Sequence, residues 1–193
     1  MMQRVDPCPC LLFVAFRCVS VVQRHYISSI RFSVNIHSNR HSHMNAHTLG
    51  KLLVLGQFGS LGALVVLAAA QFMQHSAPAL AWLALGLSGL MGVWALTANQ
   101  PGNFNIHPTP RAGGKLVAHG PYRWIRHPMY TAVMLLGLAC ALTLGNVMAW
   151  LLWGVLCVML VSKAVLEERW MAALHPTYAQ YQARTRWFIP FLL

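Results

Sequence analysis

The 193-residue sequence is apolar and basic, with 57% hydrophobic residues, 9% charged residues and a formal net charge of +11. This composition is typical of a membrane protein. Because most basic residues lie between long apolar runs, they indicate membrane topology and argue against a nucleic-acid-binding protein. The cysteines predict neither a disulfide framework nor a metal cluster, since Cys140 and Cys157 lie inside apolar runs.

Residues 1–43 differ in composition from the rest of the chain. They contain five arginines, three cysteines and no lysine, and they show no sustained hydrophobic periodicity. Their longest apolar run, at 11–16, is interrupted by Arg17 and is too short to span a bilayer. An arginine-containing, acid-poor segment can imitate an organellar transit peptide. We instead expect an over-extended start, with translation beginning at Met44, or a disordered leader.

Two apolar runs then predict a first transmembrane hairpin over residues 44–97. Residues 50–73 carry a single charge, Lys51 at the edge, and are long enough to span a bilayer. The second run, 78–97, begins with a proline suited to a first helical turn. Only residues 74–77 join the runs, so we expect an antiparallel pair. The second run also carries three glycines, spaced by three, that allow a neighbouring helix to approach closely: Gly86, Gly89 and Gly92.

Residues 98–127 are polar, basic and rich in proline and glycine, and they predict a loop. Two further apolar runs, 128–144 and 147–165, are joined only by a Gly-Asn pair and predict a second hairpin; the first is slightly short for a full span. The chain is therefore expected to be an all-α integral membrane protein with about four transmembrane helices in two hairpins. A polar C-terminal region follows, and we take 98–193 as one unit.

Charge asymmetry predicts the orientation of these helices. The loop and the tail are basic, whereas the two tight turns contain no lysine or arginine. The positive-inside rule then places both termini and the 98–127 loop in the cytoplasm, the compartment that holds soluble cofactors. The basic residues of the tail on which this orientation depends are Lys163, Arg169, Arg184 and Arg186.

The loop ends in the run Gly120-Pro121-Tyr122-Arg123-Trp124-Ile125-Arg126-His127-Pro128-Met129-Tyr130. Pro128 stands where a helix should begin, so peptide N–H groups of the first turn are expected to stay free. Such a helix start attracts a carboxylate or phosphate, and Arg126 and His127 can add charged donors. Tyr130, about one turn inside, offers a ring face and a hydroxyl. The alternative interpretation is an ordinary set of interfacial anchors.

Glu167 and Glu168 are the only acidic residues after Asp6. They can be solvated residues where the fourth span leaves the membrane, but the positive-inside rule does not explain them. Adjacent helical residues point about 100° apart, so the pair cannot share one direction, yet both can border a cavity closed by the tail. In that tail, Tyr178 and Tyr181 lie on one helical face, either packing or covering a cytoplasmic pocket.

The ordered series of these motifs resembles the isoprenylcysteine carboxyl methyltransferase and phospholipid methyltransferase superfamily. The resemblance covers 104–190 and ends at an Ile-Pro pair. It implies a membrane enzyme that uses S-adenosylmethionine, bound near the cytoplasmic face, to methylate a lipophilic or membrane-delivered acceptor. Isoprenylcysteine-type carboxyl or thiol methylation is favoured. Phospholipid N-methylation and a non-catalytic accessory protein that retains the scaffold stay open.

The resemblance also implies roles for individual residues. Arg126, His127 and Glu168 would be catalytic. Members often have a glycine where this chain has Ala132, whose methyl group can narrow the approach to the cofactor. No metal is implied, and the apolar runs show no polar code for the acceptor. The implied cofactor-binding residues are Gly120, Tyr122, Arg126, His127, Pro128, Tyr130, Glu167, Glu168, Tyr178 and Tyr181.

Overall fold

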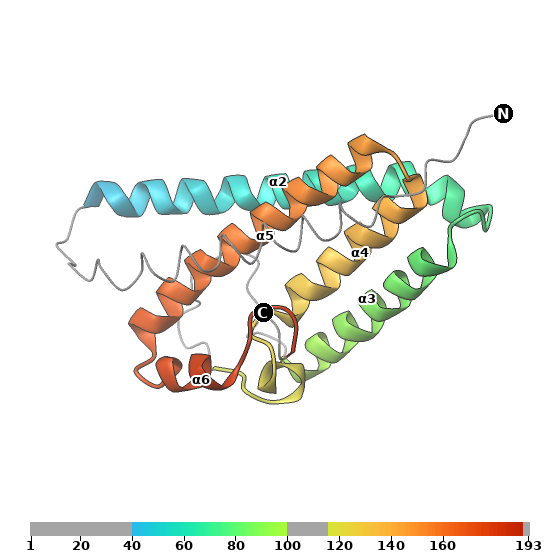
Figure 1. The fold of residues 1–193 in the computed structure, drawn as a ribbon. Coiled ribbons are helices and arrows are strands. Elements are labelled where there is room, and N and C mark those ends of the chain that lie inside the picture. Colours follow the sequence, from blue (N-terminus) through green and yellow to red (C-terminus); the bar gives the residue numbers. More distant parts are fainter. Residues whose placement is uncertain (1–39, 100–115, 191–193) are drawn as a thin grey trace.

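The computed structural model describes residues 40–99 and 116–190, with side chains from Thr48 onward (Figure 1). Most of the predicted leader, the centre of the predicted loop and the last three residues lie outside the described residues. Helix α2 already begins at Arg40, before the expected boundary at Met44. The helices are α2 (Arg40–Met73), α3 (Ala79–Ala98), the 3-10 helix η1 (Gly120–Arg123), α4 (Pro128–Leu144), α5 (Val147–Leu174) and α6 (Tyr178–Arg184).

Three of these helices contain segments long and apolar enough to cross a membrane: Thr48–Met73, Ala79–Ala98 and Val147–Leu174. Helix α4 is apolar but has only 17 residues. At 1.5 Å per residue it is about 25 Å long, shorter than the roughly 30 Å hydrocarbon core. The prediction of a helical membrane protein is thus confirmed for the described residues, and the fourth span stays a prediction. Helix α5 continues past the expected end at residue 165.

The first two long helices do not form the packed antiparallel pair that the sequence predicted. They share a short turn, but α3 packs along α4, whereas α2 packs along α5 and α4. Figure 1 shows α2 and α3 diverging from that turn. The prediction of hairpin packing is therefore wrong here, because each helix buries its inner face against later helices. The second hairpin is confirmed: α4 and α5 pack together, with Gly145 left-handed at φ 61° and Asn146 capping α5.

Helix α3 meets α4 through small residues. Ser88 Oγ donates a hydrogen bond to the carbonyl of Ala132 at 2.7 Å. Of the three predicted glycines, only Gly92 faces α4, where an added Cβ would lie 3.7 Å from the Cβ of Ala132. Gly86 and Gly89 face open space, so the predicted close approach does not involve them. The buried residues of α3 are Ala81, Ala84, Ser88, Ala95 and Ala98.

This packing predicts different effects for two equivalent glycine substitutions on α3. We expect Gly92→Leu to lower the free energy of unfolding by about 1–3 kcal/mol, because the larger side chain must displace α4 at Ala132. Gly89→Leu makes the same change in helix propensity but meets no neighbour, so stability should stay constant or rise. Chemical unfolding in detergent measures both. Equal losses for the two variants would contradict the packing.

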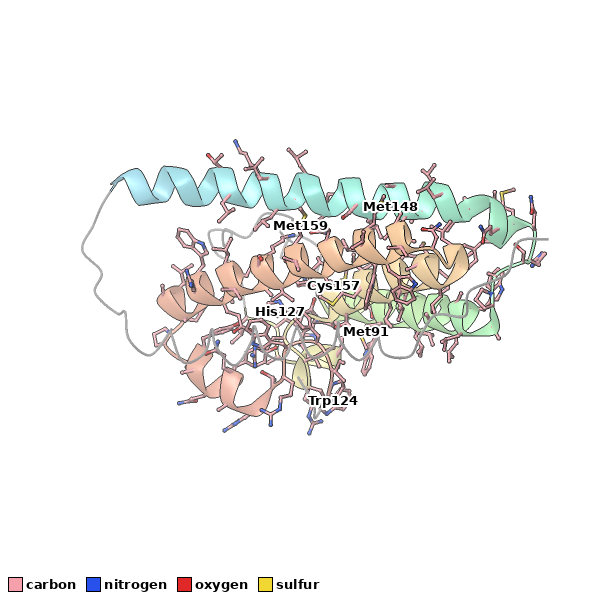
Figure 2. All side chains as sticks on the ribbon, turned by 45° about the horizontal axis from the view of Figure 1, so that its top comes forward. Met91, Trp124, His127, Met148, Cys157 and Met159 are labelled. Carbon is pink, nitrogen blue, oxygen red and sulfur yellow. The ribbon has the colours of Figure 1, made fainter. Side chains whose placement is uncertain are left out.

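The centre of the bundle is an apolar cluster of α2, α4 and α5 side chains that includes Leu64, Leu156 and Leu160. Gly56 allows α5 to approach α2, since an added Cβ would lie only 2.3 Å from the Met159 side chain. Figure 2 shows Met159 in the seam between these two helices. At one end of the bundle, the end of α3, the start of α4, the end of α5 and α6 gather together (Figure 1).

Candidate active site

The turn before α4 pairs with the segment after α6. Ile125 and Arg186 form an isolated parallel bridge. The peptide N–H of Arg126 donates to the carbonyl of Arg186 at 2.7 Å, and that of His127 donates to the carbonyl of Trp187 at 3.1 Å. This pairing fixes the backbone of the Arg-His pair and holds the C-terminal segment against it. The first and last parts of the predicted motif series therefore lie side by side.

Six side chains at this end form one hydrogen-bonded group, which we call the polar cluster. Glu168 is at its centre. Its Oε1 accepts a hydrogen bond from Arg126 Nε at 2.5 Å and lies 3.2 Å from His127 Nε2, while its Oε2 accepts from Gln182 Nε2 at 2.9 Å. The side chains of Arg126 and Glu168 are 9% and 10% exposed, so this ion pair is buried. The members are Arg126, His127, Tyr130, Glu167, Glu168 and Gln182.

Glu167 is the more accessible of the two glutamates. Glu167 accepts a hydrogen bond from the Tyr130 hydroxyl, and its Oε2 lies 3.7 Å from His127 Nδ1. Its side chain is 22% exposed, whereas that of Glu168 is 10% exposed. The His127 ring stacks on Tyr130 with 5.3 Å between ring centroids. Figure 2 shows His127 near the centre of the structure, with Trp124 farther out. The two glutamates thus meet opposite nitrogens of one histidine.

Arg126 also holds the end of α6. Its Nη1 donates to the carbonyl of Thr185 at 2.7 Å and to the carbonyl of Gln182 at 3.3 Å. The guanidinium lies 5.9 Å from the Trp187 ring centroid. Charge-assisted bonds of this kind give fixed geometry as well as attraction. Sequence reasoning missed Gln182 and Thr185, because polar residues in a short tail helix carry no distinguishing spacing.

The tail tyrosines hold α6 against η1. The Tyr181 hydroxyl donates to the carbonyl of Tyr122 at 2.8 Å, and the buried ring of Tyr178 lies 5.8 Å from that of Tyr181. Burial raises the pKa of Tyr122 to about 12, and the negative charge of Glu167 adds to the rise. Burial also raises the pKa values of Tyr178 and Tyr181. All three phenols therefore stay protonated at neutral pH.

Two of the predicted site residues determine the local backbone conformation. Gly120 has φ +59°, and an added Cβ would lie 2.7 Å from the Cβ of Ala98, so η1 lies directly on α3. Pro128 is fully buried at the first position of α4. The prediction of free N–H groups there is wrong for Tyr130 and Thr131, which donate to the His127 carbonyl at 3.0 and 3.1 Å. A tight first turn satisfies these two N–H groups, so they are not free to bind an anion.

A family model for phospholipid methyltransferases matches residues 79–177, just over half of the chain. The match contains α3, α4, α5 and all of the polar cluster except Gln182. The chain belongs to the phospholipid methyltransferase family. The resemblance predicted from the motif series is thereby confirmed, and membership indicates a membrane methyltransferase. No curated protein matches the chain.

In this member of the phospholipid methyltransferase family, the Ala132 methyl group packs against α3. Ala132 is 6% exposed, and its Cβ faces Gly92 of α3. The Ala132 carbonyl accepts a hydrogen bond from the hydroxyl of Ser88, which also lies on α3. The departure from the family glycine is therefore accommodated by the small residues of α3.

The position of Lys163 differs from the one expected from charge asymmetry. It was expected among the basic residues of the tail, but it is 3% exposed and lies inside the bundle. Its Nζ is 3.4 Å from Gln57 Oε1 and 5.1 Å from the centroid of the Tyr130 ring. The physical reason is the length of α5, which continues beyond residue 165 and keeps Lys163 on an inner face. A lysine four residues before Glu167 within an apolar run was the available signal.

Proposed function

We propose that this chain is a multi-pass membrane methyltransferase that uses S-adenosylmethionine and binds it at the polar cluster, on the cytoplasmic side. The observation that carries the proposal is the convergence of Arg126, His127 and Tyr130 with Glu167 and Glu168 at one end of the bundle, within the family match. The positive-inside rule supports a cytoplasmic location of that end and of both termini.

Differences in exposure and hydrogen bonding support different roles for the members of the polar cluster. Both oxygens of Glu168 are bonded within the cluster, and Arg126 holds the tail, so we assign these two a positioning role. Glu167 is more exposed, and we assign it to the amino group or ribose hydroxyls of the cofactor. The stacked rings of His127 and Tyr130 suit a sulfonium cation.

Bound S-adenosylmethionine supplies a methyl group on an electrophilic sulfonium, so the protein's main task is alignment of the acceptor. An acceptor carboxylate or thiolate arrives already nucleophilic, which favours isoprenylcysteine-type carboxyl or thiol methylation. A phospholipid amine is the second candidate, supported by the family description. It must be neutral to react, and His119 and His127 are the histidines considered as acceptors of its proton.

Calorimetry with S-adenosylmethionine on the detergent-purified full chain tests cofactor use. Wild type should bind, and Glu167→Gln should weaken binding about tenfold or more, the effect of losing a hydrogen bond to a charged group. Arg184→Gln, an exposed change on α6, is the control and should bind as wild type does. A folded wild type that fails to bind would contradict the proposal and favour a non-catalytic accessory protein.

Transfer of labelled methyl groups separates the acceptors. The full chain in vesicles would be given labelled S-adenosylmethionine together with a prenylcysteine, a lipophilic thiol and phosphatidylethanolamine. Base-labile label in the prenylcysteine fraction, or stable label in the thiol, supports the favoured acceptor class. Label confined to the phospholipid fraction would replace that class with phospholipid N-methylation.

A further inference from the structure

Lys163 is a buried cation whose donors are largely unused. The side chain is 3% exposed, and a lysine ammonium carries three N–H donors. Its one hydrogen bond to a described residue is the long contact of 3.4 Å with Gln57 Oε1. The ion pairs among the described residues involve Arg126 and His127, not Lys163. Buried charges in proteins are ordinarily paired, so this arrangement points to an anion from outside the described residues.

The groups that face Lys163 favour its charged form but do not neutralise it. The face of the Tyr130 ring, 5.1 Å away, is a cation–π partner. Glu167 lies one turn further along α5 on the same side, and its carboxylate is engaged with the Tyr130 hydroxyl. The buried Ser60 hydroxyl on α2 is directed to carbonyls of its own helix, at Gly56 and Gln57. The remaining N–H donors of Lys163 therefore lie beside the polar cluster, which gives the ammonium the Tyr130 ring and the nearby charge of Glu167 but no hydrogen-bond acceptor among the described residues.

The position of Lys163 relates this cation to the methyl-transfer site. It precedes Glu167 by four residues, which is about 6 Å along the helix axis. The Tyr130 ring contacts both Lys163 and the His127 ring. An acceptor of headgroup size can therefore lie against Lys163 and against a cofactor beside Glu167 at the same time. Donor and anion sites would share the Tyr130 ring as a common wall.

One of the groups around Lys163 comes from a helix outside the family match. Gln57 comes from α2, whereas the match begins at residue 79. The α2–α5 seam beside it is filled by Met159, whose flexible thioether side chain adapts readily to a neighbouring ligand. Figure 2 shows Met159 in this seam. The part of the site that selects the acceptor is then supplied by α2, while the shared family segment holds the cofactor.

We propose that Lys163 and Gln57 form a subsite for an oxyanion of the methyl acceptor, either a carboxylate or a phosphodiester, which arrives from the bilayer along the α2–α5 seam. The inference rests on the proposed function and narrows its acceptor class to lipophilic molecules that carry an anionic group. The two N–H donors of Lys163 that lack described partners bind the oxyanion. The Gln57 amide oxygen orients the ammonium.

Binding of two matched ligand pairs tests the subsite. S-farnesylcysteine is compared with S-farnesylcysteamine, which lacks the carboxylate, and a short-chain phosphatidylethanolamine with the corresponding diacylglycerol. Calorimetry uses the detergent-purified full chain saturated with S-adenosylhomocysteine. In wild type, the anionic member of at least one pair should bind about tenfold more tightly than its partner, the effect of one charge-assisted hydrogen bond. The pair that shows the preference identifies carboxylate or phosphodiester.

Variants decide whether Lys163 causes that preference. Lys163→Met and Gln57→Leu should reduce it to less than about threefold, and Lys163→Arg should retain most of it. Lys51→Met makes the same substitution at an exposed position of α2 and should leave the preference intact. Thermal unfolding shows that each variant is folded, and a methionine of similar volume in place of a buried lysine should not lower the transition temperature.

Three outcomes would overturn the inference: no preference for the anion in either wild-type pair, an unchanged preference in a folded Lys163→Met variant, or weaker S-adenosylhomocysteine binding in that variant with the anion preference intact. The last result would assign Lys163 to the cofactor instead. Failure of wild type to bind S-adenosylhomocysteine would contradict the proposed function itself. This binding is measured before any acceptor is added.

Discussion

Arg126→Met should lower the free energy of unfolding by about 3–5 kcal/mol, the cost of leaving one member of a buried ion pair without its partner. The Glu168 carboxylate is 10% exposed and receives its shortest hydrogen bond from Arg126 Nε. The same substitution removes the donor to the carbonyl of Thr185, so the C-terminal segment should separate from the turn before α4. Chemical unfolding in detergent measures the stability loss, and limited proteolysis detects release of the tail.

The paired substitution Arg126→Met with Glu168→Gln is the informative control. It removes the uncompensated charge, so the double variant should recover most of the stability that Arg126→Met loses. Arg126→Lys retains a charge but not the planar fork that reaches Glu168 and Thr185 together, so it should be intermediate. A double variant that is less stable than Arg126→Met would show that Glu168 is held mainly by His127 and Gln182.

Gly120→Ala is expected to cost about 2–5 kcal/mol, because two penalties combine at this residue. The left-handed backbone at φ +59° is unfavourable by about 1–2 kcal/mol for any residue with a Cβ. The added methyl group would also lie 2.7 Å from the Cβ of Ala98, an overpacking cost of about 1–3 kcal/mol. To relieve the contact, η1 must move away from α3, which displaces Tyr122 from the tail.

Gly145→Ala is a matched control for this prediction. Gly145 has nearly the same backbone conformation, φ +61°, but an added Cβ there meets no atom within 4 Å. It should therefore lose only the backbone part, about 1–2 kcal/mol. Unfolding of both variants in the same detergent gives the difference that belongs to the η1–α3 contact. Equal losses would mean that η1 does not depend on close packing against Ala98.

Apolar run length was sufficient to predict where most helices lie, because a bilayer requires a long, uninterrupted hydrophobic segment. It was not sufficient to predict which helices pack together. The short link at 74–77 suggested that α2 and α3 are partners, yet helix pairing depends on which faces carry small or interlocking side chains. Ala81 and Ala84 of α3 face α4, whereas Gly56 of α2 faces α5. In an almost uniformly apolar sequence, those faces are hard to distinguish.

The candidate site was predicted in part. The series of motifs identified both glutamates together with Arg126, His127 and Tyr130, because charged groups are rare in an apolar chain. Its bonding pattern was not predictable: the peptide groups of the α4 first turn were expected to be free, but the His127 carbonyl satisfies two of them. Lys163 was counted among the basic residues of the tail, because positive charge near a span end ordinarily reports topology.

The pairing of the turn before α4 with the segment after α6 has a consequence for biosynthesis. The carbonyls of Arg186 and Trp187 receive the peptide N–H groups of Arg126 and His127, about 60 residues earlier in the chain. The polar cluster can therefore close only after the C-terminal segment has been synthesised and has left the ribosome. A chain truncated before residue 182 should retain its membrane helices but lack Gln182 and the segment that pairs with the turn.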